Sequence, residues 1–196
     1  MQLTVFGLGN PGKKYELTLH NAGFEATDRL AAFLGGKTRK RCLRRYKAFS
    51  AQEGTAGIVQ DVLIVQPLTF MNSSGVIAHW FDLKDEGNTV VAVCDNMDLE
   101  PGMVRVRWVQ SRSTHKGLRS LQENMPDVRI LAVFVGIGRP AEGVSVPDHV
   151  LSRPADEQKM KLFIEGVENA SRALEMLAMG GSVTDVQFEF NKKQKI

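Results

Sequence analysis

Leu3-Thr4-Val5-Phe6-Gly7-Leu8-Gly9-Asn10-Pro11-Gly12 predicts a buried β-strand that ends in a tight turn. The run from Leu3 to Leu8 is largely apolar, and glycines, an asparagine and a proline follow it at once, as at the end of a strand. Asn10 is therefore expected at that end. Further along, His20-Asn21 stands where a helical pattern begins. Because open α/β folds bind ligands at the carboxyl ends of their strands, we expect the Asn10 amide and the His20 imidazole to face one cleft.

The same glycines spell Gly7-x-Gly9-x-x-Gly12, the fingerprint of dinucleotide-binding folds. That fingerprint requires a helix that begins at the glycines and an acidic residue at the end of the next strand. Here Pro11 and the polar run 13–16 separate the glycines from the helix, and Asp28 lies inside the helical pattern. A nucleotide-binding oxidoreductase is therefore the minor alternative, and it predicts tight binding of a dinucleotide.

The periodicity of residues 1–196 predicts a single α/β domain with a mixed, twisted central β-sheet flanked by α-helices. Continuous apolar runs at 62–65 and 90–94 are typical of strands that are buried on both faces. Residues 103–109 alternate instead, with Arg105 and Arg107 on one face of a strand. That face is either a phosphate-binding surface or the solvated side of an antiparallel strand.

Start and stop signals predict the helices. Asn72 or Ser73 is the expected N-cap of one helix, and Ser152-Arg153-Pro154 is the expected start of a long one. Residues 141–147 are expected to form a loop. The predicted helices span 21–34, 76–81, 118–124, about 152–179 and a short segment before the basic tail 192–195.

Composition indicates an ordinary globular chain in a reducing compartment. Cys42 and Cys94 stand apart without a C-x-x-C pair, no signal-peptide pattern opens the sequence, and no apolar run approaches membrane-spanning length. We therefore expect a cytoplasmic protein that does not contact membranes. The formal net charge of +3 is too small to identify a polyanionic partner by itself.

Positive charge is concentrated in one segment of the chain. Residues 37–47 carry seven cations in eleven positions and no acidic residue. Two interpretations are equally open. The run is either a solvated loop, which is the usual role of a charge run, or a phosphate-facing patch, which its charge density and the included Tyr46 favour.

Polar residues follow three apolar strands and form a candidate catalytic set with His20. Asn10, Asn72 and Asp95 supply two amides and a carboxylate. A carboxylate can fix the tautomer of an imidazole that acts as a general base, and amides can orient a water and polarise a carbonyl, so the set suits hydrolysis of an activated acyl group. Each residue also has a structural interpretation, as a turn or helix cap or a satisfied surface histidine. No G-x-S-x-G, H-E-x-x-H or zinc-ligand spacing favours a covalent nucleophile or a metal.

Four motifs in order along the chain resemble those of bacterial-type peptidyl-tRNA hydrolases. The match is colinear and covers nearly all of the sequence. The motifs are Gly7-Leu8-Gly9-Asn10-Pro11-Gly12 with Tyr15, Thr18 and His20-Asn21; Pro67-Leu68-Thr69-Phe70-Met71-Asn72-Ser73-Ser74-Gly75; Asp95-Asn96-Met97-Asp98-Leu99 with Pro101-Gly102; and Gly136-Ile137-Gly138-Arg139-Pro140.

The resemblance implies a monomeric α/β enzyme, without cofactor or metal, that cleaves the ester between a peptide and the 3′ ribose of tRNA. It implies that His20 is the general base and that Asp95 orients it. Asn10 and Asn72 would position the water, the peptide carbonyl or the tRNA end. The implied substrate-binding residues are Tyr15, Phe70, Asn72, Lys116 and Arg107. The alternative is a non-enzymatic RNA-binding relative, similar to plant organellar splicing factors that share the fold.

The sequence departs from the family pattern at two places. Lys116 stands where the family has a substrate-binding asparagine, and residues 109–114 replace a glycine-rich loop. An ammonium group only donates hydrogen bonds, so Lys116 is suited to a phosphate or to the carbonyls of the peptide. In the family a Lys/Arg pair grips the 5′ phosphate of tRNA. Arg107 fits the first position of this pair, whereas Phe134 occupies the second.

Overall fold

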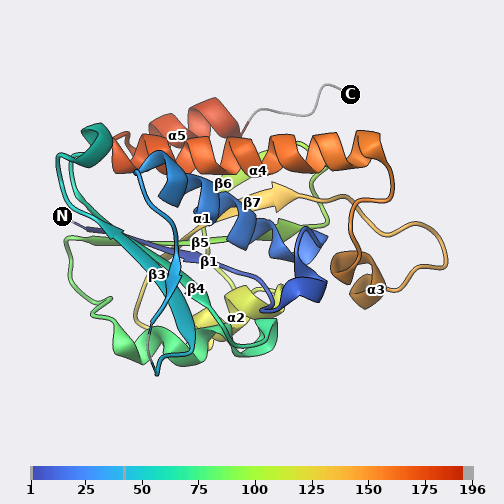
Figure 1. Ribbon diagram of the computed structural model, residues 1–196, viewed down its shortest axis with the longest axis horizontal. Helices are drawn as coiled ribbons and strands as arrows, with labels where there is room; N and C mark the ends of the chain where they lie inside the picture. The colour runs from blue at the N-terminus through green and yellow to red at the C-terminus, as the bar shows by residue number, and fades with distance from the viewer. Residues whose placement is uncertain (1, 42, 192–196) are drawn as a thin grey trace.

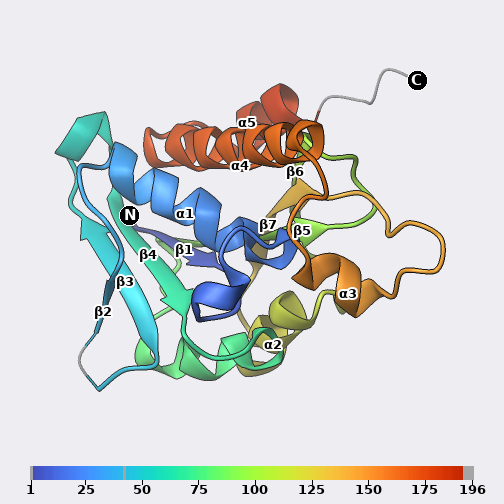
Figure 2. The same ribbon diagram turned by 45° about the vertical axis from the view of Figure 1, so that its right-hand side comes forward.

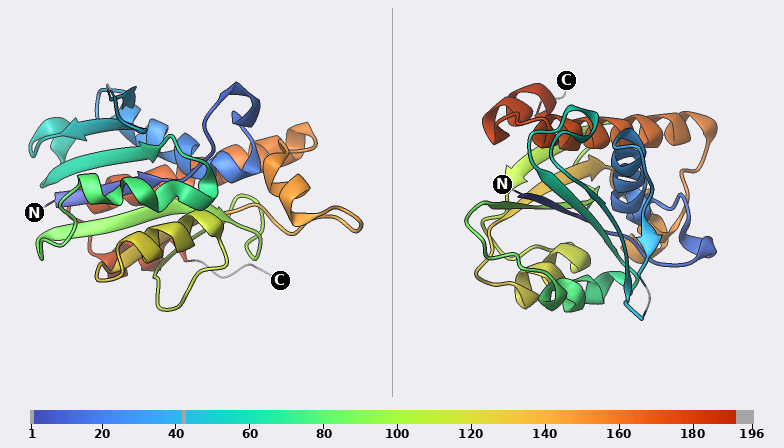
Figure 3. Two further views of the ribbon diagram at one scale, coloured as in Figure 1. Left: turned by 90° about the horizontal axis from the view of Figure 1, so that it is seen from below. Right: turned by 60° about the vertical axis from the view of Figure 1, so that its left-hand side comes forward.

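A seven-stranded mixed β-sheet runs through the middle of the protein, and Figures 1 and 3 show its twist. The computed structural model describes residues 2–41 and 43–191, so Cys42 and the basic tail lie outside the described residues. Both the α/β class and the mixed sheet are confirmed. The spatial order is β2 (Arg39–Lys40), β3 (Tyr46–Ala51), β4 (Asp61–Pro67), β1 (Gln2–Gly7), β5 (Asn88–Asn96), β7 (Ile130–Gly136) and β6 (Val104–Trp108).

The four central strands are parallel, and the outer ones are antiparallel to their neighbours. β1 pairs in parallel with β4 on one side and with β5 on the other, and β5 pairs in parallel with β7. β2, β3 and β6 are antiparallel to the strands beside them. The carboxyl ends of β4, β1 and β5 therefore meet at one edge of the sheet. Asp95 lies near this end of β5, and the segments that carry Asn10 and Asn72 follow β1 and β4.

Helices cover both faces of the sheet, as Figure 1 shows. α1 and the long α4 lie on one face, with α5 beside α4, while α2 and η4 lie on the other. α3 stands apart, near the carboxyl ends of the strands (Figure 2). The helices are α1 (Ala22–Phe33), α2 (Lys116–Asn124), α3 (Val146–Leu151), α4 (Glu157–Ala178) and α5 (Val183–Phe190), with 3₁₀ turns η1 (Lys13–Tyr15), η2 (Leu19–Asn21), η3 (Thr55–Gly57) and η4 (Met71–Trp80).

Each face of the sheet has its own hydrophobic core, because central strands with apolar residues throughout supply side chains to both sides. Val5 and Val93 face α1 and α4, where they pack with Leu30 and Phe163. Phe6 and Ala92 are buried in the core on the other face, which α2 and η4 cover. In β6 the predicted alternation is confirmed, since Val104 and Val106 are buried whereas Arg105 and Arg107 are exposed.

Two glycines are required where helices approach other backbone closely. A Cβ at Gly23 would overlap the carbonyl oxygen of Val93 and the amide of Leu8, so only glycine lets α1 rest on β1 and β5. A Cβ at Gly75 would overlap the carbonyl oxygen of Ser120. That contact holds η4 against α2 and thereby fixes two of the segments that surround the site.

Several predicted boundaries are wrong for local reasons. The long helix begins at Glu157 instead of near Ser152, because the Asp156 side chain accepts a hydrogen bond from the Lys159 amide and caps it. Ser152 instead ends α3, a helix that the sequence analysis did not predict, and its segment overlaps the predicted loop 141–147.

The segment after β4 also differs from the prediction. It begins at Met71 as the 3₁₀ turns of η4, with Phe70 at the N-cap and no capping side chain, so neither Asn72 nor Ser73 caps a helix. Part of the basic run 37–47, predicted to be a loop or a patch, pairs as β2 with β3. These are short segments in which tertiary contacts outweigh local signals.

The arrangement that a dinucleotide fingerprint requires is absent from the glycines of the first turn. α1 begins only at Ala22, and η1 and η2 come between it and Gly12. The structure therefore contradicts the nucleotide-binding alternative at this position.

Cys94 is buried and forms no disulfide with any described residue. No helix within the described ranges is both long and apolar enough to cross a membrane.

Candidate active site

A cavity of about 730 Å³ opens at the carboxyl edge of the sheet. Loops that follow β1, β4 and β5 form its floor, and residues 109–116 and α3 form other parts of its wall. Every residue that the sequence analysis selected for catalysis or substrate binding lies in the lining of this cavity. These residues are Asn10, Tyr15, His20, Phe70, Asn72, Asp95, Arg107 and Lys116.

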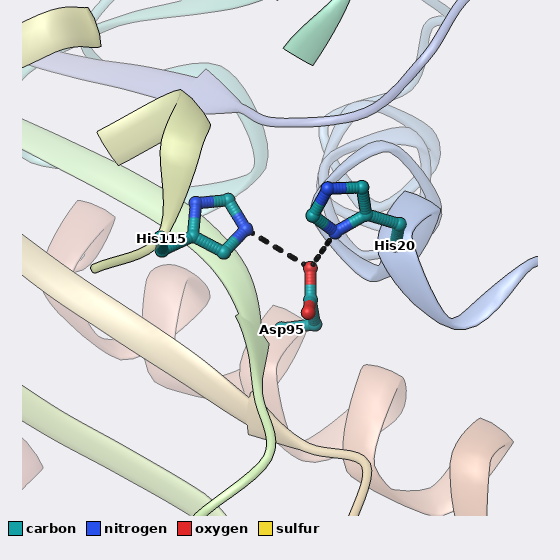
Figure 4. A group of neighbouring side chains, drawn as sticks. All are labelled: His20, Asp95 and His115. Atoms are coloured by element: carbon teal, nitrogen blue, oxygen red, sulfur yellow. Dashed lines mark hydrogen bonds and ion pairs between the residues drawn. The ribbon is translucent and has the colours of Figure 1, made fainter. Parts of the chain in front are cut away.

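Two histidines share one carboxylate oxygen at the centre of the cavity (Figure 4). His20 Nδ1 lies 2.6 Å from Asp95 Oδ1, and His115 Nε2 lies 3.0 Å from the same atom. The ring centroids of the two imidazoles are 5.1 Å apart. Asp95 is nearly inaccessible, with 3% of its side chain exposed, whereas His20 and His115 keep 12% and 11%. The histidines therefore face the cavity, and the carboxylate supports them from beneath.

Three separate elements bring these groups together. Asp95 lies near the carboxyl end of the buried strand β5, which fixes its backbone. His20 lies in η2, so its backbone directly precedes the first turn of α1. His115 is the N-cap of α2, and its Nδ1 accepts a hydrogen bond from the Leu118 amide at 3.2 Å.

The hydrogen-bond partners determine which ring nitrogen carries the proton. His115 Nδ1 accepts from an amide, so its proton is on Nε2 and is donated to Asp95. His20 Nδ1 faces the ionised carboxylate and donates to it. His20 Nε2 consequently keeps its lone pair, and it forms no hydrogen bond with any residue of the described chain. This is the tautomer that a general base requires.

Asp95 is ionised throughout the physiological range. Burial acts to raise its pKa, but the electrostatic attraction and hydrogen bond of His115, followed by those of His20, outweigh burial and hold the pKa well below its ordinary value. A permanent negative charge therefore lies beside the Nδ1 atom of His20. It favours the imidazolium that forms when Nε2 takes up a proton.

Asn10 connects the loop after β1 to the loop after β4. Its Oδ1 accepts from the Met71 amide at 2.9 Å, which orients the side chain. Asn21 holds the backbone of Asn10 from the other side, with bonds of 2.8 Å and 3.0 Å to the amide and carbonyl. Asn10 Nδ2 has no partner among the described residues, so a hydrogen-bond donor remains free at the cavity wall.

The substrate-binding candidates lie around the rim. Phe70 is 60% exposed, and Asn72, the second residue of η4, is also exposed. Tyr15 lies across the cavity in η1, with the ammonium group of Lys14 4.7 Å from its ring centroid. Lys116 is exposed at the first position of α2. The rim thus combines apolar surface with hydrogen-bond donors.

Arg107 and Phe134, the positions compared with the family's phosphate-binding pair, touch each other. The Arg107 guanidinium carbon lies 5.1 Å from the centroid of the Phe134 ring, and both residues line the cavity. The Phe134 ring thus stands where the family pattern has a second cation. It stacks against the Arg107 guanidinium and holds it in place. Arg107 keeps its hydrogen-bonding edges free, since it forms no ion pair with a described acidic residue.

His115 is the site residue that sequence reasoning missed. The sequence analysis did not select it, because it follows no strand and has no partner at a recognisable spacing. Its one available signal was its place directly before a predicted helix, where N-caps stand.

His20, Asp95 and His115 also form the one group of potential metal ligands found among the described residues, with ligand atoms within 4.8 Å of one another. Both histidines direct a nitrogen at the same carboxylate oxygen, and these hydrogen bonds account for the arrangement without an ion. The geometry suits a general base, because the His20 imidazole is bonded to a carboxylate and keeps 12% of its side chain exposed.

Comparisons with known proteins identify the family. A family model described as peptidyl-tRNA hydrolase matches residues 4–196. Peptidyl-tRNA hydrolase of Moorella thermoacetica is 36% identical over 196 residues, covering 96% of this chain and 97% of the relative. The enzyme of Methylococcus capsulatus is 35% identical over 181 residues, covering 90% and 92%. The crystal structure of peptidyl-tRNA hydrolase from Acinetobacter baumannii superposes with a TM-score of 0.81 at 25% identity, covering 96% of this chain and 93% of that one.

The sequence, the fold and the comparisons thus agree on one class, that of α/β hydrolytic enzymes. The chain belongs to the peptidyl-tRNA hydrolase family. The resemblance drawn from the four motifs is confirmed, and the non-enzymatic alternative is not favoured.

Proposed function

We propose that this protein hydrolyses the ester that joins a peptide to the 3′ ribose of tRNA, and thereby returns the tRNA to translation. The observation that carries the proposal is the pairing of His20 with the ionised Asp95, which leaves His20 Nε2 unbonded inside a cavity large enough for the end of a substrate. Family membership supplies the substrate class. An ester is more easily cleaved than an amide, so a general base and oriented donors suffice.

In the proposed reaction, His20 Nε2 removes a proton from a water molecule as the water oxygen attacks the ester carbonyl carbon. The carbonyl π electrons move to oxygen and give a tetrahedral oxyanion, which Asn10 Nδ2 is suited to stabilise. The intermediate collapses, the bond to the ribose oxygen breaks, and the imidazolium returns its proton to that oxygen. Asp95 stabilises the imidazolium through both steps.

The rim residues would hold the two parts of the substrate. Phe70 and Tyr15 offer aromatic surfaces for a base or an apolar side chain, and Asn72 offers an amide. Lys116 and Arg107 offer donors for phosphates or for carbonyls of the peptide. The proposed site needs no second subunit, since all of its residues come from one chain, and we propose that the enzyme acts as a monomer in the cytoplasm.

The direct test is cleavage of a labelled N-acetyl-aminoacyl-tRNA by the wild type and by His20→Ala. We expect turnover to collapse in the variant while its affinity for the tRNA is retained. His79→Ala is the matched control, because His79 is exposed on η4 and outside the cavity lining. Wild-type protein that binds the tRNA without cleaving it would refute the esterase proposal and favour the RNA-binding alternative. Failure to bind or cleave would refute both.

A further inference from the structure

The described part of the basic run lies at one end of the sheet, in β2, the residues that follow it and the start of β3. We name residues 37–41 and 43–47 the basic ribbon; they comprise β2, the turn that follows it and the start of β3 (Figure 2). Lys37, Arg39 and Arg41 line a second cavity of about 540 Å³. The ribbon therefore presents a hollow surrounded by positive charge, separate from the cavity that contains His20.

None of the cations of the basic ribbon forms an ion pair with an acidic side chain of the described chain. Lys40 and Lys47 are also directly paired across the antiparallel strands. Like charges in that position repel and destabilise the pairing. The folded protein thus keeps a concentration of charge that it does not neutralise itself, and a polyanion would relieve the repulsion.

The turn of the basic ribbon is joined to the active-site wall. The Leu68 amide donates to the Arg45 carbonyl at 2.7 Å, and Tyr46 is paired with Pro67. Phe70, two residues beyond Leu68, lines the catalytic cavity. The Arg44 guanidinium lies 4.9 Å from the ring centroid of Trp80, whose ring is 5.7 Å from that of Tyr46. Arg44, Tyr46 and Trp80 therefore form a group of basic and aromatic side chains next to the segment that continues to Phe70.

The basic ribbon and Arg107 lie on opposite sides of the catalytic centre. β2 is at one end of the strand order and β6, which carries Arg107, is at the other, with β1 in the middle. Six spacings of about 4.8 Å separate the two end strands by roughly 29 Å across the sheet. A single phosphate cannot contact both, so a ligand that binds both basic surfaces would have to be long.

We propose that the basic ribbon binds the phosphate backbone of the RNA whose acylated 3′ end occupies the catalytic cavity. The inference rests on the proposed function, because it takes the tRNA as the RNA. Cations that are exposed, or half-buried in the case of Lys47, that lack acidic partners and that lie beside aromatic rings match the electrostatic footprint of a nucleic-acid surface. The ribbon would then add affinity for the body of the tRNA, without a part in the chemistry at His20.

The test uses Lys40→Gln/Lys47→Gln in the full-length protein, with Lys161→Gln/Arg172→Gln as the matched control. The control pair lies exposed on α4 and removes the same two charges. Two substrates are compared, an N-acetyl-aminoacyl-tRNA and an acylated trinucleotide that is too short to reach the ribbon from the cavity. Affinity for deacylated tRNA is measured as a function of salt.

We expect the ribbon variant to bind tRNA about tenfold more weakly, with a slope of log Kd against log salt reduced by about 1.4 to 1.8, the value for two phosphate contacts. Its kcat on the trinucleotide should equal that of the wild type, and its Tm should not fall. Unchanged affinity and slope, or an equal loss in the control, would overturn the proposal.

A charged edge strand also deters pairing between chains, and this role makes a different prediction. If it were the whole explanation, Lys40→Gln/Lys47→Gln would self-associate without losing affinity for tRNA, a result that also overturns the proposal. Failure of the proposed function is distinguishable from either result, because the wild type would then leave the trinucleotide uncleaved.

Discussion

Replacing Asp95 with asparagine tests the central pair of the site most sharply. The substitution keeps the shape of the side chain and an oxygen that can accept from His20, but it removes the negative charge. Two unit charges about 4 Å apart interact by about 4 kcal/mol at an effective dielectric constant of 20. The imidazolium that forms during the reaction would lose that stabilisation, so we expect kcat to fall by about a thousandfold.

The assay is single-turnover cleavage of N-acetyl-aminoacyl-tRNA at saturating enzyme, so that chemistry is measured apart from binding. The Kd for deacylated tRNA should stay within about twofold, because Asp95 is buried beneath the histidines and does not face the RNA. Asp127→Asn is the control, since that carboxylate is exposed and bonded only to Lys84. A folded Asp95→Asn protein whose kcat stays within tenfold of the wild type would refute the assignment of Asp95 as the stabilising anion.

Three further predictions concern the same structure. His115→Gln removes a hydrogen bond to a charged group and the cap of α2, so single-turnover kcat should fall by about tenfold or more with Kd retained; an unchanged kcat would limit His115 to packing. The pKa of Asp95 is lower in the folded protein than in the unfolded chain. Its carboxylate therefore adds to the free energy of unfolding above about pH 4, and this contribution is lost as the pH falls further. Urea unfolding should therefore show a smaller difference in free energy between wild type and Asp95→Asn at pH 3 than at pH 7, and an equal difference would contradict this. Gly75→Ala should lower the free energy of unfolding by about 2 kcal/mol, because the new methyl group would overlap the Ser120 carbonyl; Ser73→Ala, in the same element, serves as control.

The sheet could be predicted because its signals are local. Long apolar runs identify parallel strands, and the alternation of residues 103–109 identifies an antiparallel one. The misjudged segments are short. β2 contains only two residues and exists because Arg39 and Lys40 pair with β3, while α3 depends on Ser145 as a cap within a segment rich in loop-forming residues. Propensity over so few residues is weaker than the tertiary contacts that decide them.

The site was predictable to the extent that its residues follow strands. Asn10 and Asp95 were selected because apolar runs end at them, and the parallel pairing of β1 with β5 puts the two ends side by side. His115 follows no strand. It reaches Asp95 because α2 packs on the sheet and its N-cap falls at the cavity, a relation that only the assembled fold contains.

The hydrogen bonds also distinguish the two histidines that contact Asp95. His115 has both ring nitrogens engaged, one by the Leu118 amide and the other by Asp95, so it can neither accept nor release a proton without breaking a bond. His20 uses only Nδ1. A general base needs a free lone pair, a partner that stabilises its charged form and access to water, and His20 alone meets all three conditions. The same carboxylate thus holds His115 as a fixed donor and, in the proposed mechanism, prepares His20 for proton transfer, so that one buried aspartate serves two histidines in different ways.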